Sequence, residues 1–299
     1  MRRAVIDIGT NTVKLFVADV DDGNVVPVSS KDRTTRLGEG LNETNRLAPT
    51  AMARTIQTIH DFVDEARRLG AEDVRALTTS AAREAGNRDE FLQGVRDQCR
   101  LEVQVVTGER EAELIFRGVT TDPQWFNQPI LVMDVGGGST EFIQGENGEI
   151  VKAQSLPIGA VRLTEEHGEN YVALVDFVRR TLHQSMNDYS VVDRRMIGTG
   201  GTITTLARIQ STRQLASAKI ASAELMDHAI ITADDLRGLI DRLRGLPLSE
   251  RRKVRGLPPE RADIIVAGGA VFLVAMEILG AANLVVSVRN LRYGAVVAS

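Results

Sequence analysis

Two distant stretches of the chain share one alternation of apolar and polar positions. Residues 4–17 and 131–143 each contain an apolar run, the triplet Asp-x-Gly, small or hydroxyl residues, and a second apolar run. A glycine turn follows each stretch, at Gly23 and Gly148. Apolar runs bounded by such turns predict strands, so each copy predicts a strand, a tight turn and two further strands. An internal repeat on this scale indicates two related lobes.

Helical periodicity dominates the segments between these strands. Apolar residues recur every three or four positions through residues 49–69, and this predicted helix stops at Gly70. Thr232 has the character of a helix N-cap. The uncharged run 264–276 is shorter than the about 20 residues that span a bilayer, so it predicts a buried helix. The other predicted elements are helices at 79–85, 89–100, 108–118 and 172–188, one helix opening at 198–202, and strands at 74–78, 101–106, 130–133 and 195–197.

The order of these elements predicts the architecture. Strands that alternate with helices favour an α/β fold in both lobes, with ligand at the strand ends in a cleft between them. Residues 120–129 have the composition of a linker. We therefore predict an N-terminal lobe at 1–124 and a C-terminal lobe at 125–299, and we expect a final helix at about 290–299 to pack back on the first lobe.

Composition narrows the function. The 299 residues are 43% hydrophobic, enough for two cores, and the net charge is −4 with acids and bases mixed. No basic block is present to follow a nucleic-acid backbone, so an anionic ligand needs local donors and metal. The single Cys99 excludes a disulfide framework. Asp7 interrupts the first apolar run, which argues against a signal peptide, and we predict a cytoplasmic protein without membrane association.

The two glycine turns are the first candidates for chemistry. Successive backbone N–H groups can converge on phosphate oxygens, and glycine permits the necessary backbone angles. One such turn alone would be read as a hairpin, but two turns that each follow an acid favour phosphate. Neither is a P-loop, and Gly198–Thr202 is a weaker signal, either a third ligand loop or a helix start. The predicted phosphate-binding residues are Gly9, Thr10, Asn11, Thr12, Gly136, Gly137, Gly138 and Ser139.

Carboxylates beside the turns are candidate metal ligands. Mg²⁺ prefers oxygen ligands, and one or two carboxylates suffice to bind it. Asp7 and Asp134 end equivalent strands, which favours a metal site over simple turn capping, whereas for Glu141 both interpretations stay open. Glu111 follows Gly108 at a helix start, where the helix dipole stabilises a carboxylate. The pattern alone favours a purely structural Glu111.

The sequence pattern alone gives little evidence that any arginine or histidine belongs to a functional site. Guanidinium groups suit phosphate, so Arg36 and Arg83 are modest candidates among many solvated arginines. The four histidines are far apart in sequence, and neither a Gly-x-Ser-x-Gly nor a His-Glu-x-x-His motif occurs. Hydrolysis through a serine triad or a zinc site is therefore disfavoured.

Nine short motifs are spread over nearly the whole chain. They are Asp7-Ile-Gly-Thr-Asn-Thr12, Arg36-Leu-Gly-Glu-Gly40, Thr79-Ser-Ala-Ala-Arg83-Glu-Ala, Gly108-Glu-Arg-Glu111-Ala112, Asp134-Val-Gly-Gly-Gly-Ser-Thr-Glu141, Leu156-Pro-Ile-Gly159-Ala-Val-Arg162-Leu-Thr-Glu165, Gly198-Thr-Gly-Gly-Thr202, Arg261-Ala-Asp263 and Ser287-Val-Arg-Asn-Leu-Arg292-Tyr-Gly294. Each is weak alone, but their order resembles the exopolyphosphatase and guanosine-pentaphosphate phosphohydrolase (Ppx/GppA) family. That family belongs to the actin, Hsp70 and sugar-kinase superfamily.

The resemblance implies both fold and mechanism. It implies two actin-like (ribonuclease H-like) lobes and an exopolyphosphatase that releases terminal phosphate from inorganic polyphosphate. Glu111 would orient and deprotonate the attacking water, which replaces its structural interpretation. Asp7, Asp134 and Glu141 would lie near Mg²⁺, with Mn²⁺ or K⁺ as other candidate cations. The glycine turns, with Arg36 and Arg83, would hold the substrate, and a homodimer is expected.

Three alternatives stay open at the level of sequence. Guanosine pentaphosphate is the rival substrate within the family. A more distant alternative is that the chain is a non-hydrolytic ATP-binding actin-like protein. An ATP-dependent kinase is the third, although the motif at 108–112 speaks against it. Lys14 and Asn290 depart from the family pattern. The extra C-terminal helical domain of long members is not found in these 299 residues, so shorter polyphosphate is the expected substrate.

Overall fold

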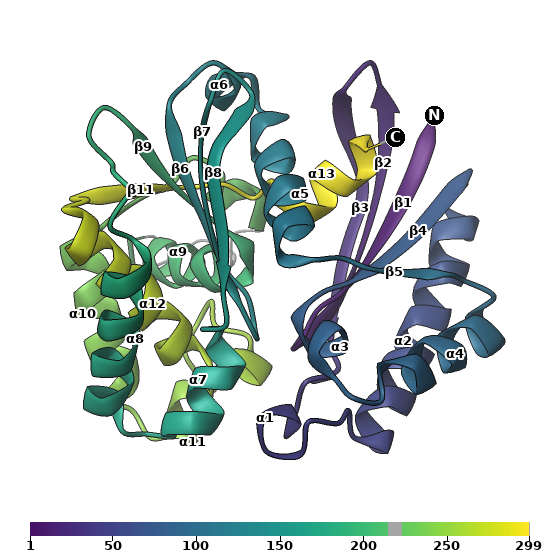
Figure 1. Ribbon diagram of the computed structural model, residues 1–299, viewed down its shortest axis with the longest axis horizontal. Coiled ribbons are helices and arrows are strands. Elements are labelled where there is room, and N and C mark those ends of the chain that lie inside the picture. The colour runs from purple at the N-terminus through teal and green to yellow at the C-terminus, as the bar shows by residue number, and fades with distance from the viewer. Residues whose placement is uncertain (215–222, 299) are drawn as a thin grey trace. The chain divides into compact units, whose positions relative to one another are not determined.

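The computed structural model describes residues 1–214 and 223–298 and divides into two compact units. Unit 1 contains Met1–Thr121 and the segment that starts at Leu291, and unit 2 contains Asp122–Asn290. The chain therefore passes between the units twice. Figure 1 shows a β-sheet with helices packed against it in each unit.

Unit 1 is built on a five-stranded sheet of order β3-β2-β1-β4-β5. β1 pairs antiparallel with β2 and parallel with β4, and β4 pairs parallel with β5. The first pairing needs only a tight turn, whereas each parallel pairing needs a helical crossover. The strands are β1 (Arg2–Ile8), β2 (Thr12–Asp21), β3 (Asn24–Thr34), β4 (Asp73–Thr78) and β5 (Val103–Val105).

Helices cover both faces of this sheet. Alternate residues of β1 point to opposite faces: Ala4, Ile6 and Ile8 belong to one buried cluster with α2, whereas Arg3 Nη1 donates to Val296 O in α13. Pro49 starts α2 at a position where its missing N–H costs nothing. The helices are α1 (Leu41–Thr44), α2 (Pro49–Arg68), α3 (Ser80–Glu84), α4 (Arg88–Cys99), α5 (Gly108–Thr120) and α13 (Leu291–Val297).

Unit 2 repeats this plan on a six-stranded sheet of order β10-β11-β9-β6-β7-β8. β6 pairs antiparallel with β7 and parallel with β9, as β1 does with β2 and β4. The α/β prediction and the duplicated strand–turn–strand unit are therefore confirmed. The strands are β6 (Ile130–Val135), β7 (Thr140–Glu146), β8 (Glu149–Leu156), β9 (Arg195–Thr199), β10 (Ile230–Thr232) and β11 (Asn283–Val286).

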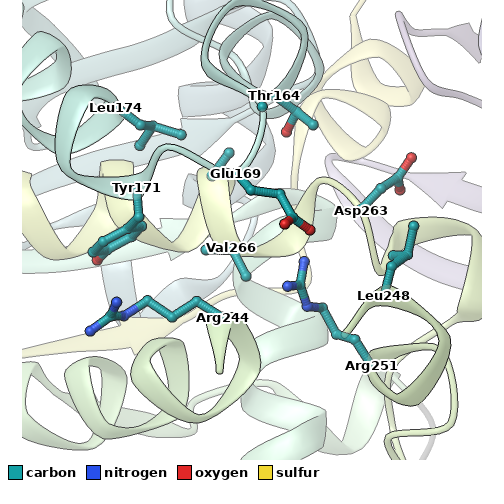
Figure 2. Close-up of a pocket in the computed structure, with 11 residues that line it drawn as sticks. Thr164, Glu169, Tyr171, Leu174, Arg244, Leu248, Arg251, Asp263 and Val266 are labelled. Atoms are coloured by element: carbon teal, nitrogen blue, oxygen red, sulfur yellow. The ribbon is translucent and has the colours of Figure 1, made fainter. Parts of the chain in front are cut away.

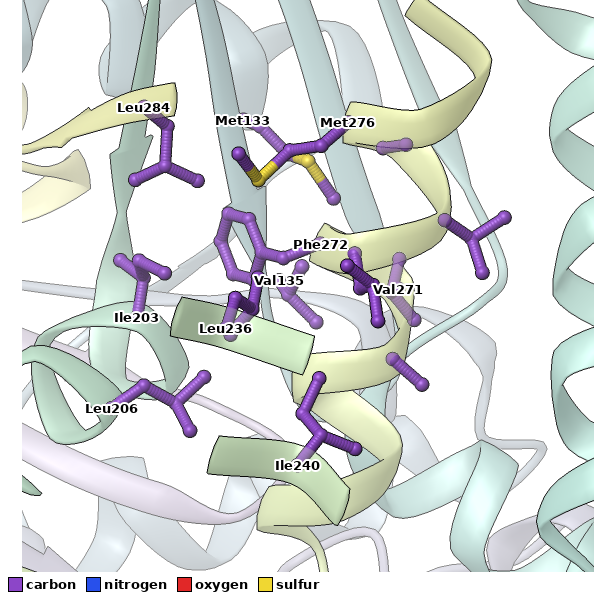
Figure 3. Close-up of a cluster of buried hydrophobic side chains, with 14 of the residues drawn as sticks. Met133, Val135, Ile203, Leu206, Leu236, Ile240, Val271, Phe272, Met276 and Leu284 are labelled. Atoms are coloured by element: carbon purple, nitrogen blue, oxygen red, sulfur yellow. The ribbon is translucent and has the colours of Figure 1, made fainter. Parts of the chain in front are cut away.

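The helices of unit 2 surround one large apolar helix, α12. The run predicted as a buried helix at 264–276 forms α12 (Ile265–Leu279), and most of its residues are buried. Figure 3 shows Phe272 and Met276 of α12 packed among side chains from the sheet and from other helices. No helix in the described parts of the chain is long and apolar enough to cross a membrane. The remaining helical segments are α6 (Pro123–Phe126), α7 (Ala160–His167), α8 (Tyr171–Ser185), α9 (Gly200–Gln214), α10 (Ala233–Arg244), α11 (Leu248–Arg251) and the 3₁₀ turns Ala223–Met226 and Pro259–Arg261.

Local signals explain where these helices begin. Thr232 caps α10 as predicted, because its hydroxyl accepts from the Asp235 amide. The predicted linker at 120–129 contains the short helix α6 instead of continuous irregular chain. Asp122 accepts from the Gln124 amide, and Pro123 occupies the first helical position.

Cys99 is a core residue. It ends α4, is buried, and its Sγ lies 3.6 Å from Ile56 O. Burial raises the pKa of the Cys99 thiol, which disfavours the reactive thiolate.

We predict that Gly294→Ala destabilises the protein by at least about 2 kcal/mol, because a methyl group there would overlap the Leu114 carbonyl oxygen of α5. Gly238→Ala is the matched control, since Gly238 lies in α10 with nothing within 4 Å of the added carbon. This control should stabilise by about 0.5–1 kcal/mol through helix propensity. Thermal unfolding of both variants checks the prediction, and equal stabilities would contradict it.

Candidate functional site

The first glycine turn connects β1 to β2 and is held by hydrogen bonds to its carbonyl groups. The Gly9 amide donates to Thr12 O at 3.1 Å, which closes the turn. The Arg36 amide donates to Asn11 O at 2.9 Å, and the Gly38 amide donates to Thr10 O at 2.9 Å. The motif that begins at Arg36 is therefore packed directly on the turn.

The second turn, between β6 and β7, is held in the same way by a different segment. The Gly136 amide donates to Ser139 O at 2.9 Å. The start of α7 then covers the carbonyls: the Ala160 amide donates to Gly136 O, and the Val161 amide donates to Gly137 O. Nearby, Gly159 has no room for a side chain against the backbone of the turn.

Several amide groups of the two turns, unlike the carbonyl groups, are not hydrogen-bonded to the described part of the chain. Within residues 1–214 and 223–298, the backbone N–H groups of Thr10, Asn11, Gly137 and Gly138 donate no hydrogen bond to the chain. Unpaired amides that follow one another in a turn form a concave site for an anion. Each turn thus has the chemistry of a phosphate-binding loop.

The three predicted acids lie beside these turns. Asp7 is buried at the end of β1, and Lys14 Nζ, opposite it on β2, lies 3.8 Å from its Oδ2. Asp134 and Glu141 face each other in the β6–β7 ladder. Glu141 is almost fully buried, and the Ser155 hydroxyl donates to it at 2.7 Å.

The third glycine loop, at residues 198–202, lies against Asp134. Gly200 has φ of +86°, and a Cβ on it would overlap Asp134 Oδ1, so the carboxylate lies directly against this backbone. A Cβ on Gly201 would similarly meet the guanidinium of Arg261 at 2.6 Å. The weak sequence signal at 198–202 therefore marks a loop that shapes the acid site as well as opening α9.

Glu111 is a buried carboxylate held by Arg83. It lies in the first turn of α5, after the N-cap Thr107. Arg83 Nη1 donates to Glu111 Oε2 at 2.9 Å and to Val106 O at 3.0 Å. This salt bridge fixes the carboxylate relative to the end of β5.

Sheet topology explains which predicted residues meet. Parallel strands present their carboxyl ends at one edge of a sheet, where ligands bind. In unit 1 the edge of β1, β4 and β5 carries the first turn, Arg83 and Glu111. In unit 2 the edge of β6, β9 and β11 carries Asp134, the second turn and the loop at 198–202. The topology thus places these residues at the same edge of the sheet in each unit.

Sequence reasoning assigned no role to several residues that support this site. Thr78 Oγ1 donates to Ile8 O at 2.9 Å, and Thr202 Oγ1 donates to Val135 O at 3.0 Å. Arg162 Nε donates to Gly138 O at 3.1 Å. Thr202, Arg162 and Arg261 stand inside the motifs quoted above, which was the available signal, whereas Thr78 gave none.

A separate cluster could also hold a metal ion. Among the described residues, Asp122, Asp227 and His228 bring one ligand atom each within 4.8 Å of one another. His228 Nε2, however, lies only 2.7 Å from Asp122 Oδ2, and Arg289 Nε lies 3.9 Å from the same oxygen. These two side chains already contact the carboxylate of the buried Asp122. Asp134 and Glu141, by contrast, offer only oxygen atoms, the ligand type that Mg²⁺ prefers.

A cavity of about 280 Å³ lies elsewhere in unit 2. Figure 2 shows Glu169 beside Arg251 over an apolar floor that includes Val266. The Arg251 guanidinium donates to the carbonyls of Leu243, Leu246 and Ala262, so it ties helix ends together. None of the predicted site residues lines this cavity.

Two α/β units, each with a glycine turn after an acid-bearing strand, define a protein of two similar lobes. Comparison with known proteins gives the family. The chain belongs to the Ppx/GppA phosphatase family, whose model matches residues 16–299. The resemblance drawn from the nine motifs is therefore confirmed.

Curated relatives cover most of the chain. It is 34% identical over 287 residues to "Exopolyphosphatase 2" of Mycobacterium tuberculosis. The matched region covers 90% of this chain and 88% of that relative. It is 33% identical over 286 residues to "Exopolyphosphatase 1" of Mycobacterium leprae, covering 93% and 84%.

Solved structures confirm the actin-like two-lobe fold. The Ppx/GppA family member of Aquifex aeolicus is 31% identical, with a TM-score of 0.80, over 99% of this chain and 96% of that one. An exopolyphosphatase of Cytophaga hutchinsonii is 27% identical, with a TM-score of 0.88, over 98% and 96%.

We predict that Gly200→Ala lowers phosphatase turnover by about 100-fold, because the new methyl group displaces Asp134 and small misplacements of reacting groups are costly. Gly280→Ala is the matched control. Gly280 also has a positive φ, of +67°, but nothing lies within 4 Å of its added carbon. Steady-state kinetics and melting temperatures of both variants check this. A loss of turnover shared equally by the two would point to general backbone strain.

Proposed function

We propose that this protein is an exopolyphosphatase that hydrolyses the terminal phosphoanhydride bond of inorganic polyphosphate. The observation that carries the proposal is the orientation of the two turns. Their carbonyls accept hydrogen bonds from the chain, whereas four of their amides donate to no group in the described part of it. Two such turns suit a substrate with several phosphates. The names of the relatives above point to the same substrate.

The residues of unit 1 supply substrate contacts and the base. Glu111 is held by Arg83 with one carboxylate oxygen, Oε2, in the salt bridge. The proposed role of Glu111 is to accept a proton from a water molecule as its oxygen attacks the terminal phosphorus. One P–O bond forms, the bridging P–O bond breaks, and the shortened polyphosphate leaves with its negative charge. Arg36 and Arg83 are proposed to contact the phosphate oxygens.

The acids supply the proposed metal site. Asp134 and Glu141, with Asp7 in unit 1, are hard oxygen ligands of the kind that Mg²⁺ prefers. When bound, Mg²⁺ would neutralise charge on the phosphate oxygens and so favour the charged transition state. Mn²⁺ would suit the same ligands, and K⁺ would supply further charge. Gly200 and Ser155 then serve to orient Asp134 and Glu141.

Guanosine pentaphosphate is the second candidate substrate. The family name covers both activities, and the turn amides would recognise the terminal phosphates of either molecule. We also propose that the protein acts in the cytoplasm and as a homodimer, which follows from the family resemblance. Analytical ultracentrifugation tests the dimer: sedimentation as a 32.6 kDa monomer at assay concentration would contradict it.

We predict that Glu111→Gln lowers kcat by about 10²–10⁴-fold, the usual contribution of a general base, while polyphosphate binding persists. Glu113→Gln is the matched control, because Glu113 lies on the same helix but forms an exposed salt bridge with Arg110. Phosphate-release kinetics and calorimetric binding separate the two effects. Near-normal turnover of Glu111→Gln would remove it from the mechanism.

We predict that polyphosphate gives the highest kcat/KM among polyphosphate, guanosine pentaphosphate and ATP, and that chelation of divalent metal abolishes release from all three. Asp134→Asn should raise the Mg²⁺ concentration needed for half-maximal rate by about tenfold or more, because the ligand loses its charge. Phosphate release measured over a Mg²⁺ series gives both results. A preference for guanosine pentaphosphate would favour the second candidate, and full activity in chelator would exclude the metal site.

A further inference from the structure

Each phosphate turn is held at its entrance by one buried threonine hydroxyl. Thr78 Oγ1 donates to Ile8 O at 2.9 Å, and Thr202 Oγ1 donates to Val135 O at 3.0 Å. Ile8 and Val135 occupy the same place in the two copies, directly after the acids Asp7 and Asp134. Both threonines are buried, with 0% and 4% of their surface exposed.

The threonine bonds act on a peptide group that is already held at its other end. The carbonyl of Ile8 and the amide of Gly9 belong to one planar peptide group, and the same holds for Val135 and Gly136. The two amides donate to Thr12 O and Ser139 O, which closes each turn. A threonine therefore fixes the carbonyl end of the plane while the turn fixes its amide end.

The peptide groups that follow in the chain are the ones proposed to bind phosphate. The unpaired amides of Thr10 and Asn11 come directly after Gly9, and those of Gly137 and Gly138 come directly after Gly136. Rotation of the first peptide plane would turn these amides away from a common point. The orientation of the anion-binding amides thus depends on the threonine bonds.

The two threonines come from elements that are not equivalent. Thr78 ends strand β4, opposite Ile8 in the parallel ladder, whereas Thr202 lies in the first turn of helix α9. Duplication of the fold alone does not explain why both threonines donate to the equivalent carbonyl of their own unit. The structure also makes room for Thr202, because Gly268 of α12 would overlap it if it carried a side chain.

We propose that Thr78 and Thr202 are positioning residues that orient the phosphate-binding amides of the two turns. This inference rests on the proposed function of the turns as phosphate loops. It assigns to both residues an effect on substrate binding that is separate from their contribution to folding.

The test replaces each hydroxyl by a methyl group of the same shape. Thr78→Val and Thr202→Val should each raise KM for polyphosphate by about tenfold, the effect of one hydrogen bond to a buried carbonyl, and their double variant should raise it further. Serine keeps the hydroxyl, so Thr78→Ser and Thr202→Ser should restore KM to within about twofold. Melting temperatures of all variants are measured in parallel.

Thr55→Val is the matched control in unit 1. Thr55 is fully buried like Thr78, but its Oγ1 has no hydrogen-bond partner in the described part of the chain. Its replacement by valine should leave KM unchanged and keep or raise the melting temperature. If the valine variants at 78 and 202 lower only the melting temperature and leave KM unchanged, the positioning role is wrong.

A binding measurement separates this inference from the proposed function. Calorimetric titration of inorganic tripolyphosphate into Glu111→Gln, with and without each Thr→Val change, needs no turnover. Weaker binding in the valine variants supports the positioning role even if the wild type releases no phosphate from polyphosphate. Binding that is equal with and without the threonine hydroxyls overturns the role, whichever substrate is hydrolysed.

Discussion

The site depends on one constraint in the two glycine turns: their carbonyl groups are hydrogen-bonded to the described part of the chain, and several of their amide groups are not. Buried carbonyls need donors, and here the segments that begin at Thr35 and Gly159 supply them from within the chain. Once the carbonyls are bonded, the planarity of the peptide group directs the neighbouring amides the other way. Four amides that have no partner among the described residues are costly to bury unless an anion or water meets them. In the proposed function, the backbone amides would therefore bind phosphate together with the arginine side chains.

The two units share the strand pairing around the turn but use different segments to bond its carbonyl groups. In unit 1 an irregular segment after β3 covers the turn, and in unit 2 the N-terminus of α7 does so. The strand pairings around the turns are the same, and the covering pieces are not. What the two copies share is therefore a geometric requirement on the turn rather than a fixed set of side chains. This explains why the sequence repeat is visible in the strands and fades in the segments that follow.

Sequence patterns predicted those structural features that depend on residues within a single segment of the chain. The paired apolar strands, the cap at Thr232 and the buried helix α12 each follow from residues within one segment. The contact between Asp134 and Gly200, and the bond from Thr78 to Ile8, join residues far apart in the chain, and no local pattern reports them. Glu111 is the intermediate case. Its helix-start position was evident, but only the family resemblance gave it a function, and the salt bridge to Arg83 required the fold.

The distribution of candidate groups divides the chemistry between the units. Unit 1 holds a proposed anion-binding turn, Arg36, Arg83 and the proposed base Glu111, whereas unit 2 holds a second such turn and the oxygen pair Asp134 and Glu141. Either turn alone could bind a phosphate. A base without metal ligands lacks charge neutralisation for the leaving polyphosphate, and metal ligands without a base lack an activated water. The proposed hydrolysis therefore needs groups from both units, and the family model, which matches from within β2 to the last residue, extends over both.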